Sequence, residues 1–215
     1  MASVYSAAAE LIGLVLKFLT SQYDDCSELE DIVVKRITDM MYERERQSQA
    51  LNCVYYIHKH YAPIIRRFIN KILNLLPKLY GIYRTRVMEC IVSYSASMED
   101  VFIHLKEQNL LETLTRKEPS TQLVGLQLVN SVMLRLQPSE LLYFMPGITA
   151  FINHQAPRCR EQMYDVLFWI YDNYNDSLEG DGSQLEMESR SILLQAVKDQ
   201  DAILKQKVLN FWLEG

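Results

Sequence analysis

The spacing of three prolines constrains the fold of this chain more than any other feature. Pro119, Pro138 and Pro157 follow one another at intervals of 19 residues, and each precedes a stretch with apolar residues every three to four positions. Proline is favoured in the first turn of a helix, where its missing N–H would have no partner. The interval predicts helices of about 15 residues joined by turns of about four, and hence helix pairs of about 38 residues. That period is close to the HEAT class of repeats.

The same apolar spacing continues along nearly the whole chain, and no stretch shows a convincing period of two. We therefore expect an all-α fold, a HEAT-like or armadillo-like α–α superhelix of about ten to eleven antiparallel helices. The expected helices cover residues 2–22, 27–45, 47–61, 63–76, 78–94, 97–114, 119–136, 138–153, 157–174, 185–199 and 201–213, with a possible break in the sixth near Asn109.

Local signals refine this map. Pro63 and Pro77 are expected to open two helices, and Ser27 with Glu30 forms the S-x-x-E pattern of a capping box. Residues 175–184, "NDSLEGDGSQ", are polar and contain glycine, so they predict a mobile acidic loop. We expect residues 1–215 to form a single solenoid with no domain boundary. Large apolar residues near both ends of the sequence suggest a fragment of a much larger chain.

The segment "RCREQMYDVLFWIYDNYND", residues 158–176, predicts a helix that is packed on more than one side. On a helical wheel its apolar residues form one broad arc: Met163, Val166, Leu167, Ile170, Tyr171 and Tyr174. Phe168 and Trp169 lie outside this arc, beside an acidic stripe of Glu161, Asp165, Asp172 and Asp176. A helix with bulky apolar groups on several flanks is expected to lie between neighbours.

Composition excludes several classes of protein. The chain is 49% apolar and 23% charged, which is ordinary for a globular protein. Glu10 and Lys17 interrupt its longest apolar run, so we expect no membrane or secretory segment. The four cysteines are far apart in sequence and form no C-x-x-C pair, which favours reduced thiols in the cytosol or nucleus.

Several stretches together resemble one family. These are "ASVYSAAAELIGLVLKFL", "LLPKLYGIYRT", "LQPSELL", "CREQMYDVLFWIYDNYND" and "VLNFWLE". They resemble, in the same order, the helical solenoid just before the FAT region in the catalytic subunits of DNA-dependent protein kinases. These are giant serine/threonine kinases of the phosphatidylinositol 3-kinase-related family.

The resemblance implies a function for the parent chain. Kinases of this family are recruited by Ku to DNA ends for double-strand break repair by non-homologous end joining, so it implies a nuclear protein that uses ATP and magnesium. The implied partners of this segment are the neighbouring solenoid and the FAT and kinase regions, with Ku and DNA as partners of the parent. The sequence has no Gly-rich phosphate loop and no H-R-D, D-F-G or DRH-like motif. We therefore expect a non-catalytic scaffold with no cofactor, no membrane and no small-molecule substrate.

Candidate chemical sites have simpler explanations. His58 and His60 are two residues apart on a helix and point to different faces, so they do not form a zinc pair. Cys159 lies between Arg158 and Arg160 at an expected helix start, a setting that lowers a thiol pKa, but no base is placed beside it. The acidic stripe is expected to be solvated or to face a partner. We predict no catalytic, cofactor-binding or metal-binding residue.

Charge suggests an alternative function. Residues 46–88 contain eight lysines and arginines and no acidic residue, with tyrosines interleaved among them. A nucleic-acid-binding module is therefore the second hypothesis, with candidate nucleic-acid or partner contacts at Arg66, Arg67, Lys71, Arg84 and Arg86. A HEAT-like protein-binding scaffold outside the kinase family is the third.

Phosphorylation gives one further candidate. The resembled kinases prefer Ser or Thr followed by Gln, and Ser183 precedes Gln184 in the expected acidic loop. We therefore predict Ser183 as a candidate phosphorylation site, although an added phosphate there would meet like charge.

Overall fold

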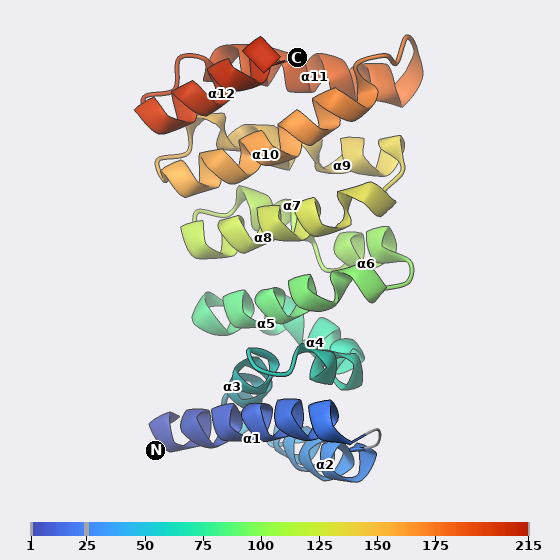
Figure 1. The fold of residues 1–215 in the computed structure, drawn as a ribbon, viewed down its shortest axis with the longest axis vertical. Coiled ribbons are helices and arrows are strands. Elements are labelled where there is room, and N and C mark those ends of the chain that lie inside the picture. The colour runs from blue at the N-terminus through green and yellow to red at the C-terminus, as the bar shows by residue number, and fades with distance from the viewer. Residues whose placement is uncertain (1, 24–25, 215) are drawn as a thin grey trace. The chain divides into compact units, whose positions relative to one another are not determined.

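The computed structural model describes residues 2–23 and 26–214, and the regular elements in these ranges are all helices (Figure 1). The all-α prediction is confirmed. The chain divides into two compact units, residues 1–98 and 99–215. The expectation that they form a single solenoid stays a prediction.

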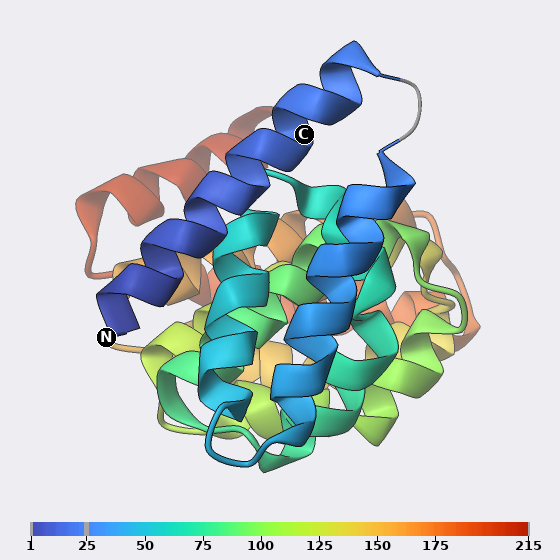
Figure 2. The same cartoon turned by 90° about the horizontal axis from the view of Figure 1, so that it is seen from below.

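The first unit is built around one central helix. Its elements are α1 (Ala2–Gln22), α2 (Ser27–Tyr42), α3 (Gln47–His58), η1 (Ala62–Arg67), α4 (Ile69–Leu75), η2 (Leu76–Lys78), α5 (Gly81–Tyr94) and η3 (Ser95–Ser97). Helix α3 packs against α1, α2, α5 and η1. Figure 2 shows α3 lying between α1 and α2. The approach of α1 to α3 requires a glycine, because a Cβ on Gly13 would lie 2.8 Å from the carbonyl oxygen of Ile57.

The second unit stacks helices in two layers. Its elements are α6 (Val101–Glu107), α7 (Leu110–Thr115), α8 (Pro119–Val132), η4 (Met133–Arg135), α9 (Pro138–Thr149), η5 (Ala150–Asn153), α10 (Pro157–Tyr174), α11 (Gly180–Ala196) and α12 (Ala202–Glu214). Helices α7, α9 and α11 pack in sequence along one layer, and α8, α10 and α12 along the other. This alternation is that of a helical solenoid.

The proline signals are correct where the 19-residue interval holds. The three prolines open three successive helices: Pro119 opens α8, Pro138 opens α9 and Pro157 opens α10. Pro63 opens the 3-10 helix η1 rather than an α-helix. Pro77 likewise stands in the first turn of a 3-10 helix, η2, and the α-helix expected from residue 78 begins at Gly81.

Three boundary predictions need correction. The helix expected from residue 97 begins at Val101, after Asp100 at a positive φ angle, and the break expected near Asn109 is confirmed, because Asn109 also adopts a positive φ angle and precedes α7. The expected capping box is absent: Cys26 precedes α2 and makes no side-chain cap. The loop predicted for 175–184 is shorter, because α11 begins at Gly180, and residues 175–179 alone join it to α10.

Helix α10 confirms the expectation of a helix packed on several sides. It contacts α8, α11, α12 and η5. Met163, Val166, Leu167 and Ile170 of the predicted arc are buried, whereas Tyr171 and Tyr174 are partly exposed. Phe168, outside the arc, stacks on Phe211 of α12 with ring centroids 4.2 Å apart. This second flank is therefore occupied by α12.

Candidate functional site

The basic residues of 46–88 form several small clusters, and most of them bind other residues of the first unit. Arg66 donates two hydrogen bonds to Glu30, at 3.0 and 3.1 Å, and Arg67 bonds to both Glu30 and Asp31. Lys71 donates to the Thr38 hydroxyl at 2.9 Å. Because Glu30, Asp31 and Thr38 all lie on α2, the structure brings Arg66, Arg67 and Lys71 together as one strip that fastens η1 and α4 to α2.

Glu30 explains why this strip forms. Its side chain is only 4% exposed, and a buried carboxylate is stable only when its charge is paired and hydrogen-bonded. The two arginines and the Tyr61 hydroxyl supply these partners. The predicted role of Glu30 in a helix cap fails for this reason, since its carboxylate is engaged by residues more than 30 positions away.

Arg84 and Arg86 lie apart from this strip. Arg84 is 3% exposed and donates to the Leu76 carbonyl at 2.9 Å, so within this chain it supports the backbone of η2; its predicted contact role stays a prediction. Arg86 bonds to Asn52 and to the Tyr56 hydroxyl and lies about 5 Å from the ring centroids of Tyr55 and Tyr56. The contact role of Arg66, Arg67, Lys71 and Arg86 stays a prediction.

Tyr55 and Tyr56 form the most distinctive aromatic group of the first unit. Their rings meet edge to face with centroids 5.3 Å apart, and the Lys59 ammonium lies over both. Burial raises the pKa of Tyr55 to about 12, with a further contribution from its hydrogen bond to Glu89 and the charge of that carboxylate. The phenol therefore stays neutral at physiological pH, and the cluster works by packing and cation–π contact.

A buried ion pair that the sequence did not reveal holds the second unit together. Arg160 of α10 is 2% exposed and binds Asp199 through two parallel bonds of 2.8 and 2.9 Å. Its remaining nitrogen donates to the carbonyl of His154 at 2.6 Å. Asp199 also accepts from the Tyr164 hydroxyl and the Asp201 amide. Since Arg160 and Asp199 are 39 positions apart, no local spacing could signal the pair.

The electrostatics of this cluster keep Asp199 charged. Burial alone would raise the pKa of Asp199, but hydrogen bonds from Arg160, Tyr164 and the Asp201 amide outweigh it and lower the pKa. Burial and the hydrogen bond to Asp199 raise the pKa of the Tyr164 phenol. The carboxylate is thus surrounded by donors and is not available as a general base. The arrangement is a structural clamp that joins the turns before α10 and before α12.

Half of the predicted acidic stripe is paired within the second unit. Lys207 of α12 lies 2.6 Å from an oxygen of Asp165 and 3.2 Å from one of Glu161. Asp172 and Asp176 are exposed. The part of the stripe open to solvent or to a partner is therefore Asp172, in the last turns of α10, and Asp176, just beyond its end.

The candidate thiol and histidines lie in structural settings. Cys159 is buried, and burial raises its pKa against the lowering effect of Arg158, so the predicted lowering is wrong. His154 hydrogen-bonds to Gln122 at 3.0 Å and accepts from the Ala156 amide. Within residues 2–23 and 26–214, no group of three or more His, Cys, Asp or Glu could hold a metal ion.

Ser183 lies in a helix instead of a loop. It is in the first turns of α11 and is partly exposed. The backbone there is hydrogen-bonded as a helix, so a kinase would have to unwind this end of α11 to reach it. The structural premise of the phosphorylation prediction, a flexible loop, is therefore wrong, and the modification itself stays a prediction.

Comparison with known proteins agrees with this geometry. A family model described as "DNA-PKcs, CC5" matches residues 1–215. The DNA-dependent protein kinase catalytic subunit of Xenopus laevis is 35% identical over 214 residues, that of Gallus gallus 32% over 213 and that of Mus musculus 30% over 213. In each case 97% of this chain matches, but the chain spans only 5% of the relative's length.

The fold also resembles a solved structure of unrelated sequence. The crystal structure of an engineered protein matches with a TM-score of 0.62 at 8% identity, covering 97% of this chain and 89% of the other. At this identity the likeness concerns the fold alone.

The two layers of alternating helices in the second unit are those of a helical-repeat protein. The matches at the level of sequence then assign the family. The chain belongs to the DNA-PKcs CC5 family. CC5 is a helical region and not the kinase domain, so the prediction that this chain is not an enzyme is confirmed.

Proposed function

We propose that this chain is a scaffold segment of a DNA-dependent serine/threonine protein kinase that acts in the nucleus in double-strand break repair by non-homologous end joining. The observation that carries the proposal is the end-to-end match to the CC5 family and to kinase catalytic subunits of three vertebrates. Ku, DNA ends, ATP and magnesium are the proposed partners and cofactors of the whole kinase, not of this segment.

The mechanism that we propose is positional. The internal charge pairs support it, because Arg160–Asp199 and Arg66–Glu30 fix turns and neighbouring helices without leaving a reactive group. In a helical solenoid, small changes at each helix-pair interface add up along the stack. The segment would in this way maintain the geometry between neighbouring solenoid and the FAT and kinase regions while DNA ends bind.

The test uses the full-length kinase. Residues corresponding to this chain are replaced by a flexible linker, and DNA-stimulated phosphorylation and ATP binding are measured. We expect ATP binding to persist and DNA stimulation to be lost, because the catalytic domain is intact but mispositioned. Unchanged DNA stimulation would refute the scaffold role. In a second test, the isolated chain should show no phosphotransfer above a mock preparation.

A nucleic-acid-binding module remains the second candidate, because residues 46–88 carry no acidic residue. Labelled duplex DNA is titrated at low and moderate salt. Phosphate contacts predict a steep loss of affinity with salt, and reversal of charge at Arg66, Arg67 and Lys71 should abolish binding. The ion pairs of Arg66 and Arg67 with α2 favour the scaffold over this alternative.

A further inference from the structure

Helix α1 exposes many large apolar side chains to solvent. Its exposed apolar side chains are Val4, Leu11, Leu14, Val15 and Phe18, at 41% to 69% exposure, with Tyr5 at 38%. Val4, Leu11 and Phe18 are spaced by seven residues, and Leu14 follows Leu11 by three. These four residues form an exposed apolar stripe along α1. This is the a/d spacing with which one helix packs along another. The only charged residues of α1 are Glu10 and Lys17, so the helix is apolar nearly all round.

The length and composition of α1 also bear on the expectation of no membrane segment. Residues Val4–Gln22 are long and apolar enough to cross a membrane by length and composition, even with Glu10 and Lys17, so the expectation of no membrane segment stays a prediction. The same criteria are met by core helices of soluble proteins. One face of α1 is already packed against α3 at Gly13, as in a helical repeat.

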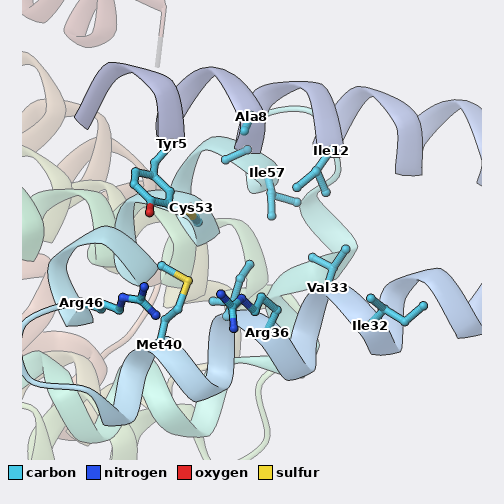
Figure 3. A pocket seen from close by; sticks show the side chains of 12 residues that line it. Tyr5, Ala8, Ile12, Ile32, Val33, Arg36, Met40, Arg46, Cys53 and Ile57 are labelled. Atoms are coloured by element: carbon cyan, nitrogen blue, oxygen red, sulfur yellow. The ribbon is translucent and has the colours of Figure 1, made fainter. Parts of the chain in front are cut away.

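A groove lies beside this stripe. Helices α1 and α2 both pack on α3, and a cavity of about 300 Å³ lies between them (Figure 3). Ala8 and Ile12 of α1 face Val33 and Met40 of α2 across it, and Cys53 and Ile57 of α3 lie beneath. Tyr5 and Ile32, at 38% and 66% exposure, show that the groove opens to the surface. It is sized for side chains of a partner helix rather than for the whole helix.

The charges of the groove are of one sign. Arg36 and Arg46 line it, and no Asp or Glu does. Arg46 forms an exposed pair with Glu43 at 3.4 Å, and Arg36 forms no ion pair within the described residues. An occupant with carboxylates would therefore gain charge pairing that the groove itself does not supply.

We propose that an amphipathic α-helix with acidic residues, from elsewhere in the same long polypeptide, docks in this groove. Its apolar residues at i, i+3 or i+4, and i+7 enter between α1 and α2, beside Ala8, Ile12 and Met40. Its carboxylates pair with Arg36 and Arg46. The proposed function supplies this source, because the chain spans only 5% of the length of its relatives. The inference rests on the proposed function as a segment of such a kinase.

The first experiment identifies the occupant in the full-length protein. A photo-crosslinking phenylalanine derivative replaces Ile32 at the groove rim, and a matched variant carries it at Ile82, an exposed isoleucine of α5 away from the groove. After irradiation, crosslinked peptides are identified by mass spectrometry. We expect position 32, and not position 82, to capture a segment of the same polypeptide with helical apolar spacing and acidic residues. Capture of lipid, of another protein or of no segment overturns the proposal.

The second experiment tests the charge pairing. A labelled synthetic peptide of the captured segment is titrated with the 215-residue chain, and anisotropy gives Kd. Arg36→Glu with Arg46→Glu should weaken binding about tenfold at low salt, and a peptide with its acids replaced by lysine should restore it. The control Lys35→Glu changes an exposed cation of α2 that does not line the groove, and should have little effect. Equal losses in both variants would refute the pairing. This experiment measures peptide affinity, whereas the test of the scaffold role measures DNA-stimulated phosphorylation. A failure of the docking proposal can therefore be told apart from a failure of the proposed function.

Discussion

Replacing Arg160 by methionine tests the clamp in the second unit most directly. Methionine keeps much of the buried side-chain volume but removes the two bonds to Asp199 and the bond to the His154 carbonyl. The Asp199 side chain is 2% exposed, so its charge would stay buried with only the Tyr164 hydroxyl and Asp201 amide as donors. Removing one partner of a buried ion pair costs about 3–5 kcal/mol. We expect a loss of this size in the free energy of unfolding.

The assay can report the second unit selectively. The chain has two tryptophans, and both lie in that unit: Trp169 in α10 and Trp212 in α12. Urea unfolding followed by tryptophan fluorescence therefore reports on the unfolding of the second unit. The Arg160→Met curve should shift to markedly lower urea.

A matched control separates burial from charge. Arg116→Met removes an ion pair of similar length, 2.8 Å to Glu112, whose side chains are 40% and 57% exposed. That change should cost less than about 1 kcal/mol, because exposed pairs contribute little. Adding Asp199→Leu to Arg160→Met should recover part of the loss by removing the unpaired charge. Equal effects of Arg160→Met and Arg116→Met would refute the reasoning.

Three further predictions concern charge and close packing. The destabilisation caused by Asp199→Asn should be largest above about pH 5 and shrink as the pH falls through the lowered pKa of the folded state; a pH-independent difference would contradict this. Glu30→Ala should lower the free energy of unfolding of the first unit by about 1–3 kcal/mol, measured by hydrogen exchange, whereas Arg66→Ala should cost less because that arginine is half exposed. Gly13→Ala should lower the melting temperature although alanine favours helix, because its Cβ would meet a backbone carbonyl of α3 at 2.8 Å; a higher melting temperature would show that α1 can move away without cost.

Comparison of expectation with structure shows where local signals were sufficient. Apolar spacing predicted α1 and α10 over their full lengths, and Asn109 marked a true break between α6 and α7. The start of α11 was missed because Gly180, Asp181 and Gly182 favour a loop on local preference. In the structure the helix extends back through them, with Asp181 placed in the first turn where its charge suits the helix dipole.

The amino-acid sequence by itself determined the helices and the family, because the period of apolar residues, the first-turn prolines and the resemblance are all properties of the order of residues. Only the tertiary structure decided the partners of the charged side chains. Glu30 could have capped its own helix, and Arg160 could have stayed solvated beside Cys159. Each is instead buried against residues more than 30 positions away, at Arg66 and Asp199. A buried charge is stable only when an opposite charge pairs with it. Which opposite charge lies close enough is determined by the packing of helices that are distant in sequence.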